Sequence, residues 1–473
     1  MLNSIVKHGR VAEILRSSMQ GKVWLSYDEG YDEARAIWNG AVEHRPAVIA
    51  RCESTRDIQV VLCACREQGL RVSVRGGGYD WAGRCLAHNG VVIDLSAMRR
   101  VTVDADARVA TVAGGATGRD VIRATAPHDL AAVTGYCGSV GMAGLTLGGG
   151  YGPLNARHGL AADNLLRAQV VLASGQVIIA DAAENPKLFW ALRGGGGNFG
   201  VVTSMQIRLH RLREIVAGTI LFPWSQAEAV LRGYAEVMAM APDELMVTAG
   251  VLSGLNGSPL LFLAPAWCGE PDGAGPVMDV LQNLGTPIHT AIHRMSYSDL
   301  LGNYDTHYDV VPGLHYAART RWLAKLTPDA ITALMAAGAT RTSPYSVILL
   351  HYLHGAATRI ADHDSAFGLR RNHFLVEVLA AWEPGPTKYA ASPRLWAQNL
   401  SNVLAQDALP GGYPNLLGPD DHEQTASAYG CNLAALEKAK RRYDPCAVFS
   451  AIPLPTEREQ ATNRHRVAER MLT

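Results

Sequence analysis

The sequence predicts an α+β protein built from two domains. Its 473 residues are about three times the usual length of a single domain, so two separate hydrophobic cores are expected. Glycine clusters between residues 75 and 200, where short strand patterns alternate with a helical one. After Arg211 glycine becomes sparse, and longer helices alternate with longer strands. This change of character places a domain boundary near residue 212.

The first part of the chain reads as short strands around one capped helix. Ser54 or Thr55 can cap a helix that runs to about Gln68 and ends at Gly69, a residue type that commonly terminates helices. Period-two patterns and turn residues predict the strands of this region. These strands are 47–50, 72–75 and 91–95, the hairpins 101–103 with 109–112 and 168–172 with 176–179, and the strand 201–209.

The second part of the chain is predicted to hold longer elements. Helical patterns cover 226–240 and 328–338, and a charged helix over 431–442 is stopped by Tyr443-Asp444-Pro445. Strands are expected at 245–252, 260–267, 346–353 and 373–382.

Composition excludes several classes of protein. Hydrophobic residues make up 48% of the chain, which excludes a disordered protein. Because 43 basic side chains balance 43 acidic ones, nothing favours a nucleic-acid or anionic-membrane partner. The longest uncharged stretch, 130–156, holds eight glycines and a proline and cannot form a membrane helix. Eight scattered cysteines and the lack of a secretory signal predict a cytoplasmic protein with reduced thiols.

Glycine is the most informative residue type. The chain has 47 glycines, and 23 of them lie between Arg75 and Gly200. Any single tract could be a set of tight turns, but three tracts in one region indicate backbone that approaches a ligand closely. A long ligand with phosphate groups is the natural candidate. No Walker A loop is present, and the tract 148–152 lacks the strand and acidic residue of a nicotinamide-binding fingerprint.

Two other kinds of site are not expected. His351 and His354 are three residues apart on a predicted strand, so they face opposite sides, and no carboxylate stands at metal-ligand spacing. No metal site is therefore predicted. The sequence also lacks the serine elbow of a hydrolase.

Taken together, the motifs resemble a known family. The chain is similar to the berberine bridge enzyme-like branch of the FAD-linked oxidases with the vanillyl-alcohol oxidase (PCMH-type) flavin-binding fold. The resemblance covers roughly residues 35–455 and rests on motifs that follow in order along the chain. They are Trp38-Asn39, Arg45-Pro46, 74–78, 92–95, 135–144, 147–152, 163–165, 188–203, Tyr413 with Asn415, Tyr429-Gly430 with Asn432, 443–445 and Phe449.

The resemblance implies both the domain plan and the cofactor. A two-subdomain FAD-binding domain is expected over 1–211 and a substrate domain with an antiparallel sheet flanked by helices over 212–424. Residues 425–473 are expected to return to the FAD-binding domain. Residues 75–79 would wrap the pyrophosphate of FAD, 137–144 would line its ring system, and Cys137 would bond it covalently. The full set of expected cofactor contacts is Arg75, Gly76, Gly77, Gly78, Tyr79, Cys137, Val140, Gly141, Gly144, Gly149, Gly152, Val202, Tyr429 and Asn432.

Two positions depart from the family pattern. Many relatives carry a histidine after the three glycines that makes a second bond to the flavin. This chain has Tyr79, which lacks an imidazole nitrogen, so we expect Tyr79 to pack beside the flavin as a wall. The sequence leaves open whether this tyrosine is natural or replaces a histidine. His354 stands where relatives often have glycine, and we expect it to shape the pocket.

The expected activity is oxidation by FAD of a C–H bond in a small organic substrate, which can be a sugar, an alcohol or an alkaloid-like metabolite. Glu377 is the only charged residue in the apolar run 374–382 and is the expected catalytic base, with Tyr413 as the alternative. Dioxygen is the expected final acceptor, and the chain is expected to be a monomer or homodimer. A dehydrogenase with another acceptor and a flavin-binding protein without turnover remain alternatives.

Overall fold

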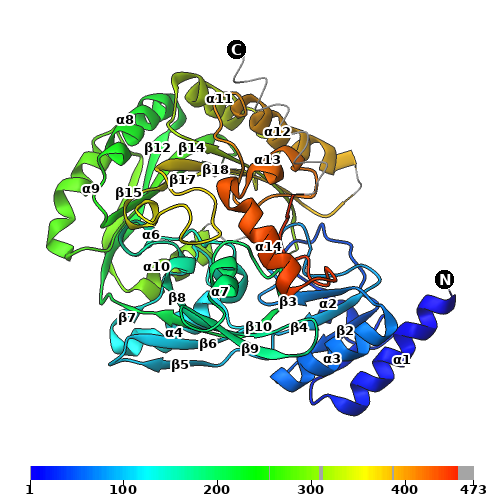
Figure 1. Cartoon of the computed structure of the whole chain (residues 1–473). Coiled ribbons are helices and arrows are strands. Elements are labelled where there is room, and N and C mark those ends of the chain that lie inside the picture. Colours follow the sequence, from blue (N-terminus) through cyan, green and yellow to red (C-terminus); the bar gives the residue numbers. More distant parts are fainter. Residues whose placement is uncertain (1, 255, 308–312, 386–387, 456–473) are drawn as a thin grey trace.

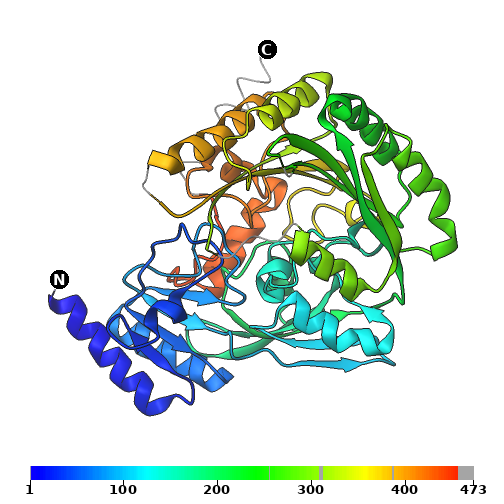
Figure 2. The ribbon, with the colours of Figure 1, turned by 180° about the vertical axis from the view of Figure 1, so that it is seen from behind.

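The computed structural model of the chain describes residues 2–254, 256–307, 313–385 and 388–455. Three main sheets lie around a central region, as Figures 1 and 2 show from opposite sides, and β7 (Leu130–Ala131) pairs with β11 (His210–Arg211) in a separate two-stranded ribbon. Two smaller sheets come from the first half of the chain, and one large sheet comes from the second half. The predicted α+β class is confirmed.

The first sheet joins parallel and antiparallel strands. Its order is β1-β2-β4-β3, with β2, β4 and β3 parallel and β1 antiparallel to β2. Helices α1 (Leu2–Ser18) and α3 (Thr55–Gln68) pack on it and share its core. The predicted caps of α3 are confirmed, because the Ser54 side chain accepts a hydrogen bond from Asp57 N–H and Gly69 ends the helix at φ 65°. The strands are β1 (Val23–Leu25), β2 (Val48–Arg51), β3 (Val72–Arg75) and β4 (Val91–Asp94).

The second sheet is antiparallel and contains both predicted hairpins. Its order is β5-β6-β10-β8-β9. Its apolar face packs against three short helices, α4 (Gly118–Thr125), α5 (Met142–Leu147) and α7 (Pro186–Leu192). The strands are β5 (Val101–Asp104), β6 (Val109–Ala113), β8 (Leu165–Val171), β9 (Val177–Asp181) and β10 (Val201–Arg208).

The third sheet has seven antiparallel strands in the order β15-β12-β14-β13-β17-β18-β16. One face is covered by helices α8 (Ala227–Ala239), α9 (Gly275–Gln282), α11 (Pro328–Ala339) and α12 (Lys388–Leu404), which form the outer rim in Figure 1. The other face turns towards the first two sheets. The strands are β12 (Ile215–Pro223), β13 (Leu245–Ser253), β14 (Pro259–Trp267), β15 (His289–Met295), β16 (His315–Leu323), β17 (Val347–Leu353) and β18 (His373–Trp382).

The C-terminal segment packs against elements from the first half of the chain. Helix α13 (His422–Ser427) is followed by α14 (Leu433–Tyr443), and α14 contacts α7. Leu436, Ala439 and Tyr443 of α14 share a core with Leu188 and Leu192 of α7. We propose on this basis the domain division at 211/212 and at 424/425.

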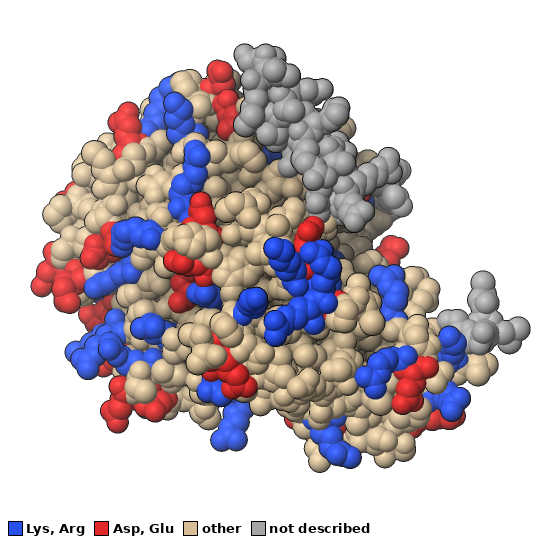
Figure 3. Space-filling model, viewed as in Figure 1, with Lys and Arg blue, Asp and Glu red and all other residues tan. Residues whose placement is uncertain are grey.

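The surface carries charges of both signs. Basic and acidic side chains are interspersed on the face seen in Figure 3. Among the described residues, no helix is both long enough and apolar enough to cross a bilayer.

Candidate active site

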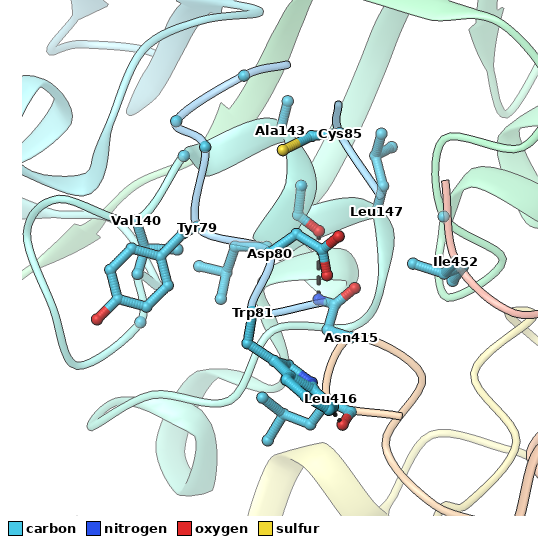
Figure 4. Close-up of a pocket in the computed structure, with 18 of the residues that line it drawn as sticks. Tyr79, Asp80, Trp81, Cys85, Val140, Ala143, Leu147, Asn415, Leu416 and Ile452 are labelled. Atoms are coloured by element: carbon cyan, nitrogen blue, oxygen red, sulfur yellow. Dashed lines mark hydrogen bonds between the residues drawn. The ribbon is translucent and has the colours of Figure 1, made fainter. Parts of the chain in front are cut away.

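A single cavity collects most of the residues that the sequence singled out. It encloses about 360 Å³ and is lined by residues from all three sheets and from the C-terminal segment. Ten of its lining residues are glycines, and they come from the three predicted glycine tracts and from Gly114. In Figure 4, Tyr79 and Val140 lie on one side of the pocket and Ile452 on the opposite side. Part of the cavity wall is therefore backbone without side chains.

The first glycine tract forms a cradle because it touches the second tract through backbone atoms alone. The loop 76–78 follows β3 directly, and Gly77 lies face to face with Gly141, the residue before α5. A Cβ atom on Gly77 would stand 2.4 Å from the Gly141 nitrogen, and one on Gly141 would stand 2.5 Å from the Gly77 nitrogen. Only glycine at both positions permits this approach.

The third glycine tract is joined to residues 451–452 of the C-terminal segment by one asparagine side chain. The Asn198 Oδ1 atom accepts a hydrogen bond from Ala451 N–H at 2.7 Å, and its Nδ2 atom donates to the Ile452 carbonyl at 3.1 Å. Gly196 and Gly197 line the cavity on one side of this junction, together with Ala451 and Ile452 on the other. The C-terminal segment therefore closes this end of the cavity.

The loop that carries Cys137 is held by backbone bonds on two sides. Gly118 N–H donates to the Val140 carbonyl at 2.9 Å, and Arg119 N–H donates to the Gly138 carbonyl at 2.8 Å. From helix α10 (Tyr297–His307), Asp305 accepts from Gly138 N–H at 2.7 Å and pairs with Arg119 at 2.7 Å. Cys137 lines the cavity and forms no disulfide. Because Asp305 belongs to the second half of the chain, both halves of the chain hold the loop that carries Cys137.

Tyr79 forms part of an aromatic wall. Its ring stacks on Trp38 with centroids 4.8 Å apart and an interplanar angle of 23°. Trp38 in turn packs on Tyr316 of β16 at 4.8 Å. Tyr79, Trp38 and Val140 all line the cavity. Tyr79 therefore packs on Trp38 as part of the cavity wall, and it has no ring nitrogen that could bond to a ligand.

The large sheet contributes a row of polar side chains to the opposite part of the cavity. Thr248 on β13, His351 on β17 and Glu377 on β18 stand on three successive strands. The Thr248 Oγ1 and His351 Nδ1 atoms are 3.3 Å apart, and His351 Nε2 is 3.8 Å from a Glu377 carboxylate oxygen. The Glu377 side chain is 17% exposed, and β18 lies inside the sheet between β17 and β16. Glu377 is thus a cavity carboxylate rather than an edge-strand surface charge.

Tyr413 reaches the same cavity from the C-terminal segment. Its hydroxyl oxygen accepts hydrogen bonds from Gly150 N–H at 3.1 Å and from the Asn415 side chain at 2.9 Å. Asn415 also donates to the Gly144 carbonyl, a bond drawn as a dashed line in Figure 4. Burial raises the pKa of Tyr413 to about 12, although these hydrogen bonds act in the opposite direction. Tyr413 therefore keeps its proton at neutral pH.

Several predicted contact residues do not line the cavity. Arg75 donates to the Ala34 carbonyl, and Gly149 and Gly152 lie against Phe367 and the Thr134 carbonyl. The Tyr429 hydroxyl donates to the Pro453 carbonyl at 2.7 Å. The Asn432 side chain donates to the carbonyl oxygens of Asp362 and Ser365 at 2.6 and 3.0 Å. These residues hold neighbouring loops in place. The expected cavity contacts that do line it are Gly76, Gly77, Gly78, Tyr79, Cys137, Val140, Gly141, Gly144 and Val202, together with Glu377 and Tyr413.

The expectation that His354 shapes the pocket is not met. His354 is buried beside the carbonyl of Leu245 at 3.0 Å and is not a lining residue. His354 follows the last residue of β17, and His351, within that strand, lines the cavity instead. Among the residues that the structure describes, no group of three or more histidine, cysteine or acidic side chains could hold a metal ion.

The sequence analysis missed three residues of the site, namely His351, Thr248 and Tyr136. His351 and Thr248 are each a polar residue within an otherwise apolar strand, which is the pattern that identified Glu377. Tyr136 precedes Cys137 and packs on the His351 ring with centroids 4.7 Å apart and an interplanar angle of 32°. Applying the same criterion to every strand would have found the first two.

Comparison with known proteins agrees with this geometry. Residues 46–181 match the FAD binding domain family. The chain is 32% identical to the (R)-6-hydroxynicotine oxidase of Paenarthrobacter nicotinovorans over 90% of this chain and 95% of that protein. The crystal structure of 6-hydroxy-D-nicotine oxidase from Arthrobacter nicotinovorans superposes with a TM-score of 0.84 at 29% identity, covering 93% of this chain and 98% of that one. Glucooligosaccharide oxidase from Acremonium strictum superposes with a TM-score of 0.84 at 23% identity, covering 94% and 99%.

The fold and the site thus define an FAD-dependent oxidoreductase. The chain belongs to the berberine bridge enzyme-like family of FAD-linked oxidases.

The residues of the cavity fit FAD. A glycine-lined channel lets backbone N–H groups approach a pyrophosphate without side chains between them. The contact between Gly77 and Gly141 forms a cradle that any Cβ atom would fill. The cavity then continues past Cys137 and Val140 to Glu377, so a ring system placed beside Cys137 would face the polar row of the large sheet. The loop 76–78, Gly141 and Gly144, Cys137, Val140 and Val202 are the residues that would hold the cofactor.

Proposed function

We propose that the chain is an oxidase that removes a hydride from a C–H bond of a small organic substrate, with covalently held FAD as hydride acceptor and dioxygen as final acceptor. The observation that carries this proposal is the single cavity in which a glycine cradle, Cys137 and the carboxylate of Glu377 meet. FAD supplies the two-electron acceptor. The protein residues hold it, orient the substrate and accept a proton.

Glu377 is the proposed catalytic base. Hydride leaves a C–H bond readily when an O–H or N–H proton is removed at the same time. The Glu377 carboxylate lines the cavity and is largely shielded from solvent, so it can meet such a proton. Tyr413 also lines the cavity, but its raised pKa of about 12 keeps the phenol protonated. Tyr413 is therefore better suited to donating a hydrogen bond than to accepting a proton.

The test of the proposed function is anaerobic mixing with a panel of sugars, alcohols and cyclic amines. An oxidase loses its yellow flavin absorbance with its substrate and regains it in air, with hydrogen peroxide produced in equal amount. A dehydrogenase would bleach in the same way but recover slowly in air without a second acceptor. Lack of bleaching with any compound would favour a flavin-binding protein without turnover.

Cys137 is proposed to carry the flavin through a thioether to carbon 6 of its ring. The bond replaces the thiol hydrogen and the ring hydrogen, and dioxygen takes the electron pair that is released. The glucooligosaccharide oxidase of similar fold is described as holding a 6-S-cysteinyl, 8α-N1-histidyl FAD. Tyr79 lacks the nitrogen needed for the second of these bonds, so a single link is proposed here.

The first prediction concerns this link. Acid-precipitated protein is expected to stay yellow, and Cys137→Ala is expected to release all of its flavin into the acid supernatant. Cys137 is held at the cavity by the backbone bonds of its neighbours Gly138 and Val140, and Cys85 is another thiol that lines the cavity. Absorbance of the washed pellet measures the outcome. Cys63→Ala, a change at an exposed cysteine on α3, is the matched control and should leave the pellet yellow. A colourless pellet from the unchanged holoprotein would contradict the proposal.

The second prediction concerns access of dioxygen. Val140 lines the cavity three residues after Cys137, and its side chain borders the space that a flavin face would occupy. Val140→Leu adds one methylene group there and is expected to slow recovery of flavin absorbance in air by about ten-fold or more, because a packed cavity excludes even small solutes. Anaerobic bleaching by substrate should change little. Equal recovery rates in the two proteins would show that Val140 only packs.

A further inference from the structure

The polar row at the substrate end has a geometry that selects one kind of substrate group. His351 is nearly buried, with a side chain 6% exposed, and its Nε2 atom points to Glu377 across 3.8 Å. This separation is too long for a direct hydrogen bond. Both side chains line the cavity, so a ligand in the cavity can approach the two atoms together.

The protonation of His351 follows from its neighbours. The Nδ1 atom lies 3.3 Å from the Thr248 hydroxyl, which can donate to it. Nε2 then carries the hydrogen, because a lone pair on Nε2 would face the carboxylate of Glu377 and repel it. A doubly protonated ring would also carry a hydrogen on Nε2. In either form the cavity presents a hydrogen-bond donor on His351 beside an acceptor on Glu377.

A hydroxyl group matches this pair because it accepts one hydrogen bond and donates another. Its oxygen can accept from His351 Nε2–H while its hydrogen points to Glu377. An aliphatic amine is cationic at neutral pH and has donors only, so it can bond to Glu377 but leaves the Nε2–H group of His351 without an acceptor. The pair therefore discriminates an alcohol from an amine.

The remaining walls restrict the body that carries the hydroxyl. Side chains without any polar atom surround the pair, from strands β14, β16, β17 and β18. They are Phe262, Ala264, Ala318, Leu349, Leu375 and Leu379. A sugar has a hydroxyl on almost every carbon, and most of these would be buried here without a partner, which costs binding energy. Tyr136 and Tyr304, in edge-to-face contact at 5.5 Å, add ring surfaces that suit a flat apolar frame.

We infer that the substrate is an alcohol carried on an apolar ring frame, with its hydroxyl held between His351 Nε2 and the Glu377 carboxylate. This inference rests on the proposed function. In the reaction the O–H proton passes to Glu377, the hydrogen of the adjacent C–H bond leaves with its electron pair to FAD, and the C–O bond becomes a carbonyl. His351 is then a residue that determines specificity by orienting the hydroxyl.

The test compares three probes, 1-indanol, 1-aminoindane and glucose. The first two share one ring frame and differ only in hydroxyl against amine. Binding is measured under anaerobic conditions by the change that each probe causes in the visible flavin spectrum of the Glu377→Gln holoprotein, whose amide oxygen can still accept a hydrogen bond and whose flavin is expected to be reduced slowly. We expect 1-indanol to bind at least about ten-fold more tightly than either other probe, as one hydrogen bond in a shielded site allows.

Two variants of His351 separate its donor from its ring. His351→Phe keeps a ring to pack against Tyr136 and removes the donor, so the preference for 1-indanol over 1-aminoindane should fall about ten-fold. His351→Gln restores an N–H donor near the position of Nε2 and should recover most of the preference. Retention of the full preference in the Phe variant would overturn the role of His351. Tighter binding of 1-aminoindane or glucose, or no binding of 1-indanol, would overturn the substrate class.

The oxidase proposal and the alcohol inference are tested by different measurements. Bleaching and peroxide production with any probe, or with another compound, test the oxidase proposal. Binding of 1-indanol with a His351-dependent preference but without bleaching would support the recognition site and count against the proposed oxidation. Bleaching by an amine with no preference for 1-indanol would support the oxidase and overturn the alcohol inference.

Discussion

Glu377→Gln is expected to slow substrate-dependent bleaching of the flavin by roughly 10²–10⁴-fold at fixed pH, the usual contribution of a positioned general base. The amide has nearly the same shape as the carboxylate, and its oxygen can still face His351. It cannot take up the proton that must leave the substrate as the C–H bond breaks. The loss should therefore fall on the rate of bleaching at saturating substrate rather than on binding.

The measurement is stopped-flow absorbance under anaerobic conditions, with the fastest reductant found in the panel of sugars, alcohols and amines. Tyr413→Phe is the matched comparison, because Tyr413 lines the same cavity and is the alternative base. Flavin content and thermal unfolding temperature of both variants check that the cavity remains intact. Normal bleaching in Glu377→Gln together with slow bleaching in Tyr413→Phe would assign the base to the tyrosine.

The parts of the fold that sequence alone predicted are those with local causes. The helix α3 begins at the Ser54 cap and ends at the left-handed Gly69, and both signals lie within the helix sequence itself. The two hairpins of the second sheet follow from alternating apolar residues around short turns. The glycine tracts predicted a bound ligand because backbone without Cβ atoms can approach a ligand closely, wherever the tract lies in the fold.

The substrate end of the site depends on pairings that no local pattern contains. His351 meets Glu377 because β17 and β18 are neighbours and in a register that pairs His351 with Leu375, one diagonal step from Glu377. Thr248 meets His351 because β13 lies on the other side of β17. A single histidine or threonine in an apolar strand is ordinary, so only the assembled sheet shows that these residues form one group.

Two residues of the family motifs bond to other parts of the chain and do not line the cavity. Asn432 belongs to a motif of the resemblance, yet its side chain bonds to the carbonyl oxygens of Asp362 and Ser365 rather than lining the cavity. The Tyr429 hydroxyl is occupied by the Pro453 carbonyl. A family motif contains residues that the fold requires, and some of these residues hold loops in place rather than contact a ligand. The distinction between a loop anchor and a ligand contact requires the three-dimensional arrangement.

Gly77→Ala is expected to produce a folded chain that holds little FAD. The added Cβ atom would stand 2.4 Å from the nitrogen and 2.7 Å from the Cα atom of Gly141, and 3.2 Å from the Ser139 carbonyl oxygen. These are backbone atoms, which cannot rotate away as a flexible side chain can. The loop 76–78 and the start of α5 must therefore separate, and their separation opens the cradle.

We expect the two backbones to move apart to relieve this strain, and this movement would open the arrangement that holds the cofactor. Overpacking of this kind costs about 1–3 kcal/mol, so the dissociation constant for FAD before the thioether forms should rise by roughly ten- to a hundred-fold. The ratio of flavin to protein absorbance after refolding with limiting FAD measures the effect, and Gly77→Val should lose more flavin than Gly77→Ala. Gly275→Ala is the matched control, since a Cβ atom at that exposed glycine of α9 meets no atom within 4 Å. Full flavin content in Gly77→Ala would show that the contact between the first two glycine tracts does not hold the cofactor.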